Sequence, residues 1–299
     1  MEDKNHSDQG LQTVLDNIGE VVDLVALNIK RTAARCGIEG TKYAITFRFR
    51  HAWDPVPGEI LTVESNKKWC FKGHAYLSGK IRSKRIDAPA LGLKPLVLNE
   101  WGLWDPSQDY WRNEDSPMAD WERIIAGAGP RPSFEMEQVV PGDDLDGDGP
   151  ILAAVARMGE GDDEKAARIL SELAEADLRC LDAHSHLGNI VFEASPELAL
   201  KHYQVGVEIG GLSFPENFNG VLPWGLIDNR PYLRCLHGYG LSLWRLERFD
   251  EALAIFERLL WHNPIDNLGA RFLVDQVLAG KGWREEESQA DSDYEYRLP

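Results

Sequence analysis

The chain has 299 residues, of which 43% are hydrophobic, and a net charge of −17. This length suffices for one large domain or two ordinary ones, and ten tryptophans favour folded domains over a disordered chain. The acidic charge argues against non-specific binding of the whole chain to nucleic acid or to an anionic membrane. The charge is uneven, because residues 42–94 contain 11 Lys or Arg and 4 Asp or Glu, a local charge of +7 that leaves −24 for the rest.

The four cysteines are far apart and form no CxxC pair, so the sequence predicts neither a disulfide framework nor a zinc site. Residues 1–10 are polar and acidic, and we expect them to be disordered and to lack a secretory signal. The longest apolar stretch, at 21–29, is interrupted by Asp23 and Asn28 and is far shorter than the ~20 residues that span a bilayer. We therefore expect a cytoplasmic protein without a membrane segment.

Apolar residues recur at steps of three and four near the start of the chain, which is typical of one face of an amphipathic helix. We predict a helix over residues 11–34, ended by Gly37 and Gly40. The apolar stripe consists of Leu11, Val14, Leu15, Ile18, Val22, Val25 and Ile29.

The pattern then changes to an alternation of apolar and polar residues at 43–50, with Tyr43, Ile45, Phe47 and Phe49 on one face and charged residues on the other. Short strand-like runs separated by turn residues follow this segment. They predict a small antiparallel barrel or sandwich, which completes a domain over residues 11–103. The further strands are expected at 59–64, 68–72, 77–82 and 96–98.

Prolines and glycines discourage long regular elements at residues 104–150, which we interpret as a linker. Its acidic, turn-rich end contains Asp144, Asp146 and Asp148, which match the first half of a calcium-binding EF-hand loop. The twelfth loop position is Val155, where a bidentate glutamate is required, so we expect an acidic hinge and no calcium site. Residues 284–299 are expected to be an acidic, disordered tail.

Residues 233–264 have a spacing typical of two packed helices. Gly240 lies in the first helix, Ala252 follows twelve residues later, Phe256 four further on, and Pro264 eight beyond that. The small residues allow the helices to approach closely, the aromatic fills the gap to the next hairpin, and the proline ends the second helix. This spacing resembles the tetratricopeptide repeat (TPR) family.

Two further copies support the resemblance, which covers residues 151–280. The matching residues are Leu187, Gly188, Ala199 and Tyr203 in one copy, and Ala154, Ala166 and Leu170 in a weaker one. The resemblance implies an array of helical hairpins at 151–283 with an insertion at 210–230, and an irregular helical bundle is the alternative. The aromatics of the insertion either form a binding surface or cover the seam between hairpins.

The chain is thus predicted to be α+β, with an N-terminal helix and small antiparallel β domain followed by an all-α TPR-like array. The resemblance implies a scaffold or adaptor whose first helices line a groove for a peptide or protein partner. Asn189, Arg234 and Arg245 would hold a carboxylate or the backbone of that partner, and Trp244 would either anchor it or pack between repeats. The implied groove positions are Ser185, Asn189, Phe192, Arg234, His237, Leu241, Trp244 and Arg245.

A basic segment of the β domain supports an alternative function. Positive charge alternates there with Trp69 and Phe71, an arrangement that binds single-stranded nucleic acid by base stacking and phosphate contacts. The other interpretation is a solvated basic face, or one docked on the acidic half of the chain. The basic face consists of Lys67, Lys68, Lys72, Lys80, Arg82, Lys84 and Arg85.

Enzymatic motifs are not recognisable in the sequence. It has no G-x-S-x-G, no P-loop and no G-x-G-x-x-G. His184 and His186 are two residues apart and point away from each other on a helix, so they predict no metal site. We expect a non-catalytic protein without cofactor or metal, and an active site assembled from scattered residues is the third alternative.

Overall fold

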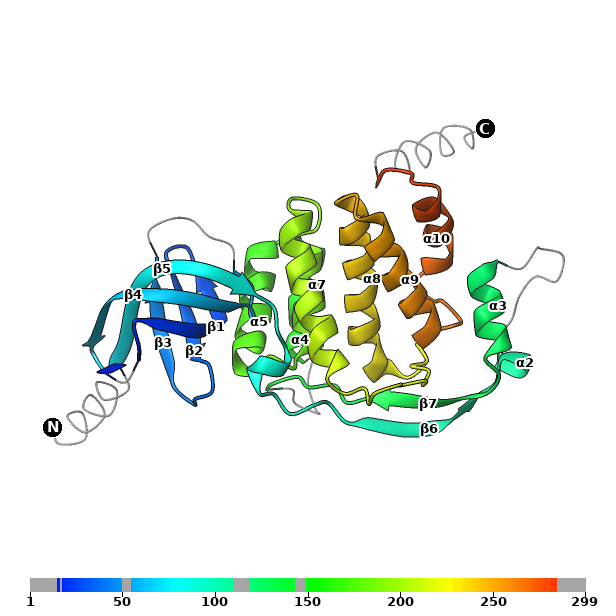
Figure 1. The fold of residues 1–299 in the computed structure, drawn as a ribbon, viewed down its shortest axis with the longest axis horizontal. Coiled ribbons are helices and arrows are strands. Elements are labelled where there is room, and N and C mark those ends of the chain that lie inside the picture. Colours follow the sequence, from blue (N-terminus) through cyan, green and yellow to red (C-terminus); the bar gives the residue numbers. More distant parts are fainter. Residues whose placement is uncertain (1–14, 17, 50–54, 110–118, 143–148, 284–299) are drawn as a thin grey trace. The chain divides into compact units, whose positions relative to one another are not determined.

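The computed structural model describes residues 15–16, 18–49, 55–109, 119–142 and 149–283. The chain is α+β, with strands concentrated in its N-terminal part (Figure 1). It divides into two compact units, Met1–Pro95 with Val139–Ile190 and Leu96–Gln138 with Val191–Pro299. Each unit combines two separate stretches of chain. Within the described residues, no helix combines the length and the apolar character needed to cross a membrane.

Five strands of the first unit form one closed sheet in the order β1-β2-β3-β5-β4 (Figure 1). Neighbouring strands are antiparallel except β3 and β5, which are parallel. The closed sheet leaves no unpaired outer strand, because β1 pairs with both β2 and β4. The strands are β1 (Val21–Lys30), β2 (Ala33–Ile38), β3 (Ala44–Arg48), β4 (Ile60–Phe71) and β5 (His74–Arg85).

The helix predicted at 11–34 is wrong over the part that forms β1 and β2. Residues 11–14 and 17 lie outside the described residues, and among the described residues before β1 Leu15 and Asp16 are helical. The β1 sequence VVDLVALNIK contains so many apolar residues that a three–four spacing and an alternation both fit it. Its β-branched residues favour a strand, and the ladders with β2 and β4 satisfy its backbone groups. Gly37, predicted to end the helix, lies within β2.

The interior of the closed sheet follows the predicted alternation in β3. Ile45 and Phe47 are buried and Phe49 packs against the same cluster. The two runs predicted at 59–64 and 68–72 form the single strand β4. The β4–β5 ladder has two register shifts, one between Thr62 and Val63 and one between Ser65 and Lys67. Gly79 pairs with Ser65 beside the second shift, where a Cβ would lie 2.2 Å from the Glu64 carbonyl oxygen.

Three helices complete the first unit: α4 (Pro150–Gly159), α5 (Asp163–Ala176) and α6 (Leu181–Val191). Ala154, Leu170 and Leu187 belong to one apolar cluster that packs the three helices together. Helix α5 also contacts the strands, because Glu175 accepts a hydrogen bond from Asn28 Nδ2 (2.6 Å) and pairs with Arg35 (2.9 Å). This polar contact joins the helices to β1 and β2.

The segment predicted to be a linker, at 104–150, and the end of the predicted domain at 11–103 contain regular elements of the second unit. Strands β6 (Leu98–Trp104) and β7 (Arg131–Met136) form an antiparallel pair, and α2 (Pro106–Asp109) and α3 (Asp120–Gly127) lie between them in the chain. A parallel bridge joins β7 to Val221 in the insertion. Gly102, at φ +147° beside a register shift, interrupts the alternation from which β6 could have been predicted.

The second unit continues with the helices α7 (Pro196–Gly211), α8 (Arg230–Arg245), α9 (Phe249–His262) and α10 (Ala270–Leu278), preceded in the case of α8 by the 3-10 turn η2 (Ile227–Asn229). Helix α8 packs against α7 and α9. A Cβ on Gly238 would lie 2.4 Å from the Tyr203 ring, and one on Gly240 would lie 2.6 Å from the Phe256 ring. Glycine is therefore required at both contacts, and Phe256 packs within its own hairpin.

The insertion at 210–230 packs two of its aromatics into the second unit. Phe214 and Phe218 are stacked with ring centroids 4.5 Å apart, and Phe218 lies 5.4 Å from Phe134 of β7. Asn229 fixes the end of the insertion by accepting from Met136 N and donating to the carbonyl of Phe134. Phe214 and Phe218 therefore pack within the second unit, against Phe134, Tyr232 and His262.

Candidate functional site

Two of the predicted groove residues have fully buried side chains. Ser185 and Trp244 are both 0% exposed. Trp244 donates from Nε1 to the Lys281 carbonyl (2.8 Å), and its ring packs edge-on against Trp283 at 5.1 Å. Neither side chain reaches the surface in this conformation, in which Trp244 packs inside the second unit.

Arg245 and Phe192 form an internal contact of the second unit. The guanidinium Nη1 of Arg245 donates to the Phe192 carbonyl at 2.7 Å and pairs with Glu193 at 3.2 Å. The same guanidinium lies 4.7 Å from the centre of the Phe192 ring. Because these interactions hold the end of α8 to the chain that precedes α7, Arg245 is committed to structure and is a poor carboxylate ligand.

His237 is mostly withdrawn from solvent. Burial lowers its pKa to about 4, so the imidazole is neutral at physiological pH. Its ring centroid lies 6.4 Å from that of Phe256, across the α8–α9 contact. This histidine therefore offers no positive charge to a partner.

Arg234, a predicted groove residue of the second unit, has a partly exposed side chain whose guanidinium could donate hydrogen bonds to a ligand. Its guanidinium lies 5.6 Å from the centre of the Trp224 ring, and that of Arg230 lies 5.0 Å from the same ring. Arg230 Nε also donates to the Trp224 carbonyl at 3.1 Å. Trp224, Arg230 and Arg234 are called the Trp224 cluster below.

Asn189, another predicted groove residue, is exposed on α6 and belongs to the first unit.

Sequence reasoning identified Arg234 in this cluster and missed Arg230. The signal for Arg230 was its position at the start of α8, one turn before Arg234 on the same helical face. Trp224 was recognised as an aromatic of the insertion, but its contact with the two arginines follows from the turn that precedes α8 and was not visible in the spacing.

His184 of the His-x-His pair and the nearby Cys180 are buried. His184 is fully buried, its Nε2 lies 3.0 Å from the Leu178 carbonyl, and burial lowers its pKa to about 4. Burial raises the pKa of the Cys180 thiol to about 12. In the part of the chain that the structure describes, no group of three potential metal ligands is present. Asp144, Asp146 and Asp148 lie outside the described residues.

Part of the predicted basic face is engaged by local partners. Arg85 pairs with Asp23 (2.9 Å), with Glu39 (3.3 Å) and more distantly with Asp87 (3.7 Å). Arg82 pairs with Glu64, and Lys68 donates to the Ile18 carbonyl. Exposed basic side chains of the predicted set are Lys67, Lys72, Lys80, Arg82 and Lys84.

Aromatic and cationic side chains gather on the outer face of the closed sheet. Trp69 of β4 lies opposite Tyr76 of β5, and the rings are stacked with centroids 5.3 Å apart and planes inclined by 9°. The Lys67 ammonium lies 5.4 Å from the Trp69 ring, and the Arg48 guanidinium lies 5.7 Å from the Tyr76 ring. These four residues are called the barrel-face cluster. Arg48 and Tyr76 were not predicted as site residues. The alternation at 43–50 does place Arg48 on the outer face of the strand, because the preceding Phe47 faces the interior.

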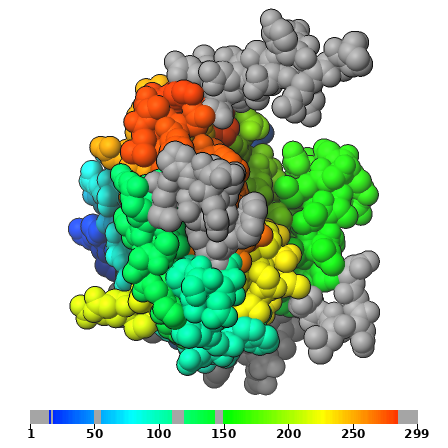
Figure 2. Space-filling model, turned by 90° about the vertical axis from the view of Figure 1, so that its right-hand side faces the viewer, coloured from blue at the N-terminus to red at the C-terminus, as the bar shows by residue number. Residues whose placement is uncertain are grey.

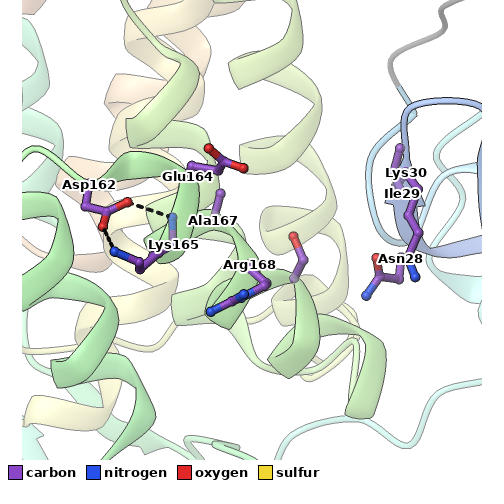
Figure 3. Close-up of a pocket in the computed structure, with 9 residues that line it drawn as sticks. Asn28, Ile29, Lys30, Asp162, Glu164, Lys165, Ala167 and Arg168 are labelled. Atoms are coloured by element: carbon purple, nitrogen blue, oxygen red, sulfur yellow. Dashed lines mark hydrogen bonds and ion pairs between the residues drawn. The ribbon is translucent and has the colours of Figure 1, made fainter.

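A cleft of about 670 Å³ lies between β1 and α5 in the first unit (Figure 3). Asn28, Ile29 and Lys30 form one side, and residues of α5 form the other, as the labels in Figure 3 show. Asp162 at the start of α5 accepts from the backbone and side chain of Lys165. The acidic groups and the lysines of this cleft compensate each other, so its charge indicates no ligand class.

Apolar side chains are exposed on the second unit. Trp101 and Leu103 of β6 are each 66% exposed, and Ile124 of α3 is 63% exposed. Figure 2 shows the chain around β6 and α3, coloured teal to green, at the surface of this unit.

Comparison of the chain with protein-family models, with curated proteins and with solved structures gives no match. The functional argument therefore depends on the side chains themselves. Two surfaces have recognisable binding chemistry: the Trp224 cluster of the second unit and the barrel-face cluster of the first.

Proposed function

We propose that this chain is a cytoplasmic interaction scaffold that binds an acidic segment of a protein partner through short TPR-like helical hairpins. The observation that carries the proposal is the Trp224 cluster, in which one partly exposed indole lies 5.0 and 5.6 Å from two guanidinium groups. The partner site is placed on the face of α8 that presents Arg234.

Close helix contacts support the TPR-like part of the proposal. The Gly240–Phe256 and Gly238–Tyr203 contacts join α8 to α9 and to α7 without space for a Cβ. Ala252 is also fully buried, at the position where the repeat has a small residue. Such packing gives a rigid support for surface residues, which lowers the entropy lost when a partner binds.

The chemistry of the Trp224 cluster favours an acidic ligand. A guanidinium presents several donors in a plane and forms paired hydrogen bonds with a carboxylate. Contact with the indole already orders both arginine side chains, so less side-chain freedom remains to be lost. A hydrogen bond to a charged group contributes about 1.5–3 kcal/mol, so removal of Arg234 should weaken binding roughly ten- to hundredfold.

The test is affinity capture from the native cell extract with tagged wild-type protein and with Arg234→Gln and Trp224→Ala variants. Arg157→Gln on α4 is the matched control, since Arg157 pairs only with its helical neighbour Glu160 in the described contacts. We expect a captured protein that is lost with the first two variants and retained by the control. A synthetic acidic peptide from that protein should then bind with the same ranking.

Identical captured proteins for wild type and all variants would contradict the proposal. Arg245→Gln is unsuitable for this purpose, because Arg245 holds the Phe192 carbonyl and its loss would disturb the fold. Unfolding curves measured for every variant separate a lost ligand contact from a lost structure.

A further inference from the structure

We propose that the barrel-face cluster and the neighbouring Lys72 bind single-stranded nucleic acid, with Trp69 and Tyr76 as the surface on which bases stack and Arg48, Lys67 and Lys72 as phosphate contacts. The site is independent of the partner-binding function proposed above, because α8 and the barrel-face cluster belong to different units. Each proposal can therefore fail without the other.

The strand register places these residues on one face. Trp69 lies opposite Tyr76, and Tyr76 lies beside Thr46 of β3. In the next row, Ser78 lies opposite Lys67 on one side and Arg48 on the other. Residues two apart in a strand share a face, so both rows project outward, whereas the intervening Phe47 and Leu77 are buried inside.

The aromatic pair is the feature that points to bases. Both rings are partly exposed and nearly parallel, although large aromatics on a solvated sheet face gain little from facing water. Base–aromatic stacking is the usual way in which proteins hold unpaired bases, and it tolerates any sequence because every base has a flat face. A duplex hides these faces, so the site selects single strands.

The cations near the pair are available to phosphates. Arg48, Lys67 and Lys72 are exposed, and no ion pair of theirs is found among the described contacts. Lys72 lies 5.3 Å from the ring of Phe71, which is itself 57% exposed at the β4–β5 turn. Phe71 and Lys72 therefore extend the same aromatic and cationic surface along β4. Three phosphate contacts on a single strand give a salt dependence of log K with a slope of about −2.

An acidic polypeptide is the competing ligand, since it would also satisfy the three cations. An acidic peptide gains little from two stacked rings, whereas an unpaired base binds by stacking on them. The contribution of the rings therefore separates the two ligands. Loss of one stacking contact weakens oligonucleotide binding roughly five- to hundredfold, and it leaves the binding of an acidic peptide almost unchanged.

The experiment measures fluorescence anisotropy of a labelled twelve-residue oligothymidylate with the full chain between 20 and 200 mM NaCl. Trp69→Leu removes the flat ring and keeps an apolar side chain, and Lys67→Glu reverses one phosphate contact. Arg157→Glu is the control, because it makes the same type of charge reversal on α4. Thermal unfolding confirms that each variant is folded.

We expect binding at low salt that weakens with a slope of about −2 and that is reduced five- to hundredfold by Trp69→Leu but not by Arg157→Glu. A duplex of the same length should bind at least tenfold more weakly. No oligonucleotide binding at 20 mM NaCl would overturn the proposal. Equal binding of polyglutamate, with no effect of Trp69→Leu, would overturn it in favour of an acidic peptide.

Discussion

Arg131 is a buried cation without a carboxylate partner among the described contacts, and its replacement tests how the second unit is stabilised. Its side chain is 0% exposed and lies 3.8 Å from the centre of the Trp261 ring and 5.1 Å from that of Trp104. Nη1 donates to the Trp261 carbonyl at 3.0 Å, but Nε and Nη2 have no hydrogen-bond partner in the described structure. Burial lowers the pKa of Arg131 to about 10.

The favourable and unfavourable contributions of Arg131 to the free energy of unfolding nearly cancel. A pKa lowered to about 10 corresponds to a desolvation cost of up to about 3 kcal/mol, and each unpartnered N–H adds about 1–3 kcal/mol. Desolvated cation–π contacts contribute about 2 kcal/mol each, and the charge-assisted hydrogen bond contributes about 1.5–3 kcal/mol. Arg131→Met removes the costs together with the gains and keeps most of the volume. We expect its free energy of unfolding to stay within about 1.5 kcal/mol of the wild type.

Arg131→Lys provides the contrast. A lysine keeps the buried charge but loses the flat group that stacks on Trp261, so it should cost about 2–3 kcal/mol. Denaturant unfolding followed by circular dichroism at pH 7 measures both variants against Arg131→Ala, which adds a cavity. The reasoning is refuted if Arg131→Met destabilises the protein by 3 kcal/mol or more, or costs more than Arg131→Lys.

Two further predictions concern helix contacts and pH. Gly240→Ala forces a Cβ to within 2.6 Å of Phe256 and should destabilise the protein by about 1–3 kcal/mol. Gly159→Ala in α4 meets no neighbour and should stabilise it by up to about 1 kcal/mol. Equal effects of the two variants in calorimetry would contradict the Gly240–Phe256 contact. His184 is neutral when folded, with a pKa of about 4 against an ordinary 6.5, so the unfolded chain binds more protons and stability falls as pH falls from 6.5 towards 4. His184→Gln should reduce the loss between pH 7 and pH 5 by about 2 kcal/mol, and an unchanged loss in denaturant unfolding would assign the acid sensitivity elsewhere.

The predictability of the fold differed between its helices and its N-terminal strands. Glycine spacing around α8 is informative, because Gly240 meets Phe256 within a hairpin whose helices are close in sequence. The β1 sequence fits a helical and a strand periodicity equally well. It forms a strand because its backbone pairs with β4, about forty residues away. Elements whose backbone partners are distant cannot be assigned from local spacing, which also explains why β7 was interpreted as part of a linker.

The same limit applies to the candidate sites, where charge pattern identified residue types but not their neighbours. Lys68 and Arg85 belong to the basic segment in sequence, yet one bonds the Ile18 carbonyl and the other is surrounded by carboxylates. Arg48, from another strand, takes a place beside Tyr76. The register shift between Ser65 and Lys67 brings Trp69 opposite Tyr76, and a slip of one residue would turn the indole inward. The barrel-face cluster thus depends on the register between β4 and β5. A one-residue insertion in β4 should therefore abolish oligonucleotide binding even though every basic residue is retained.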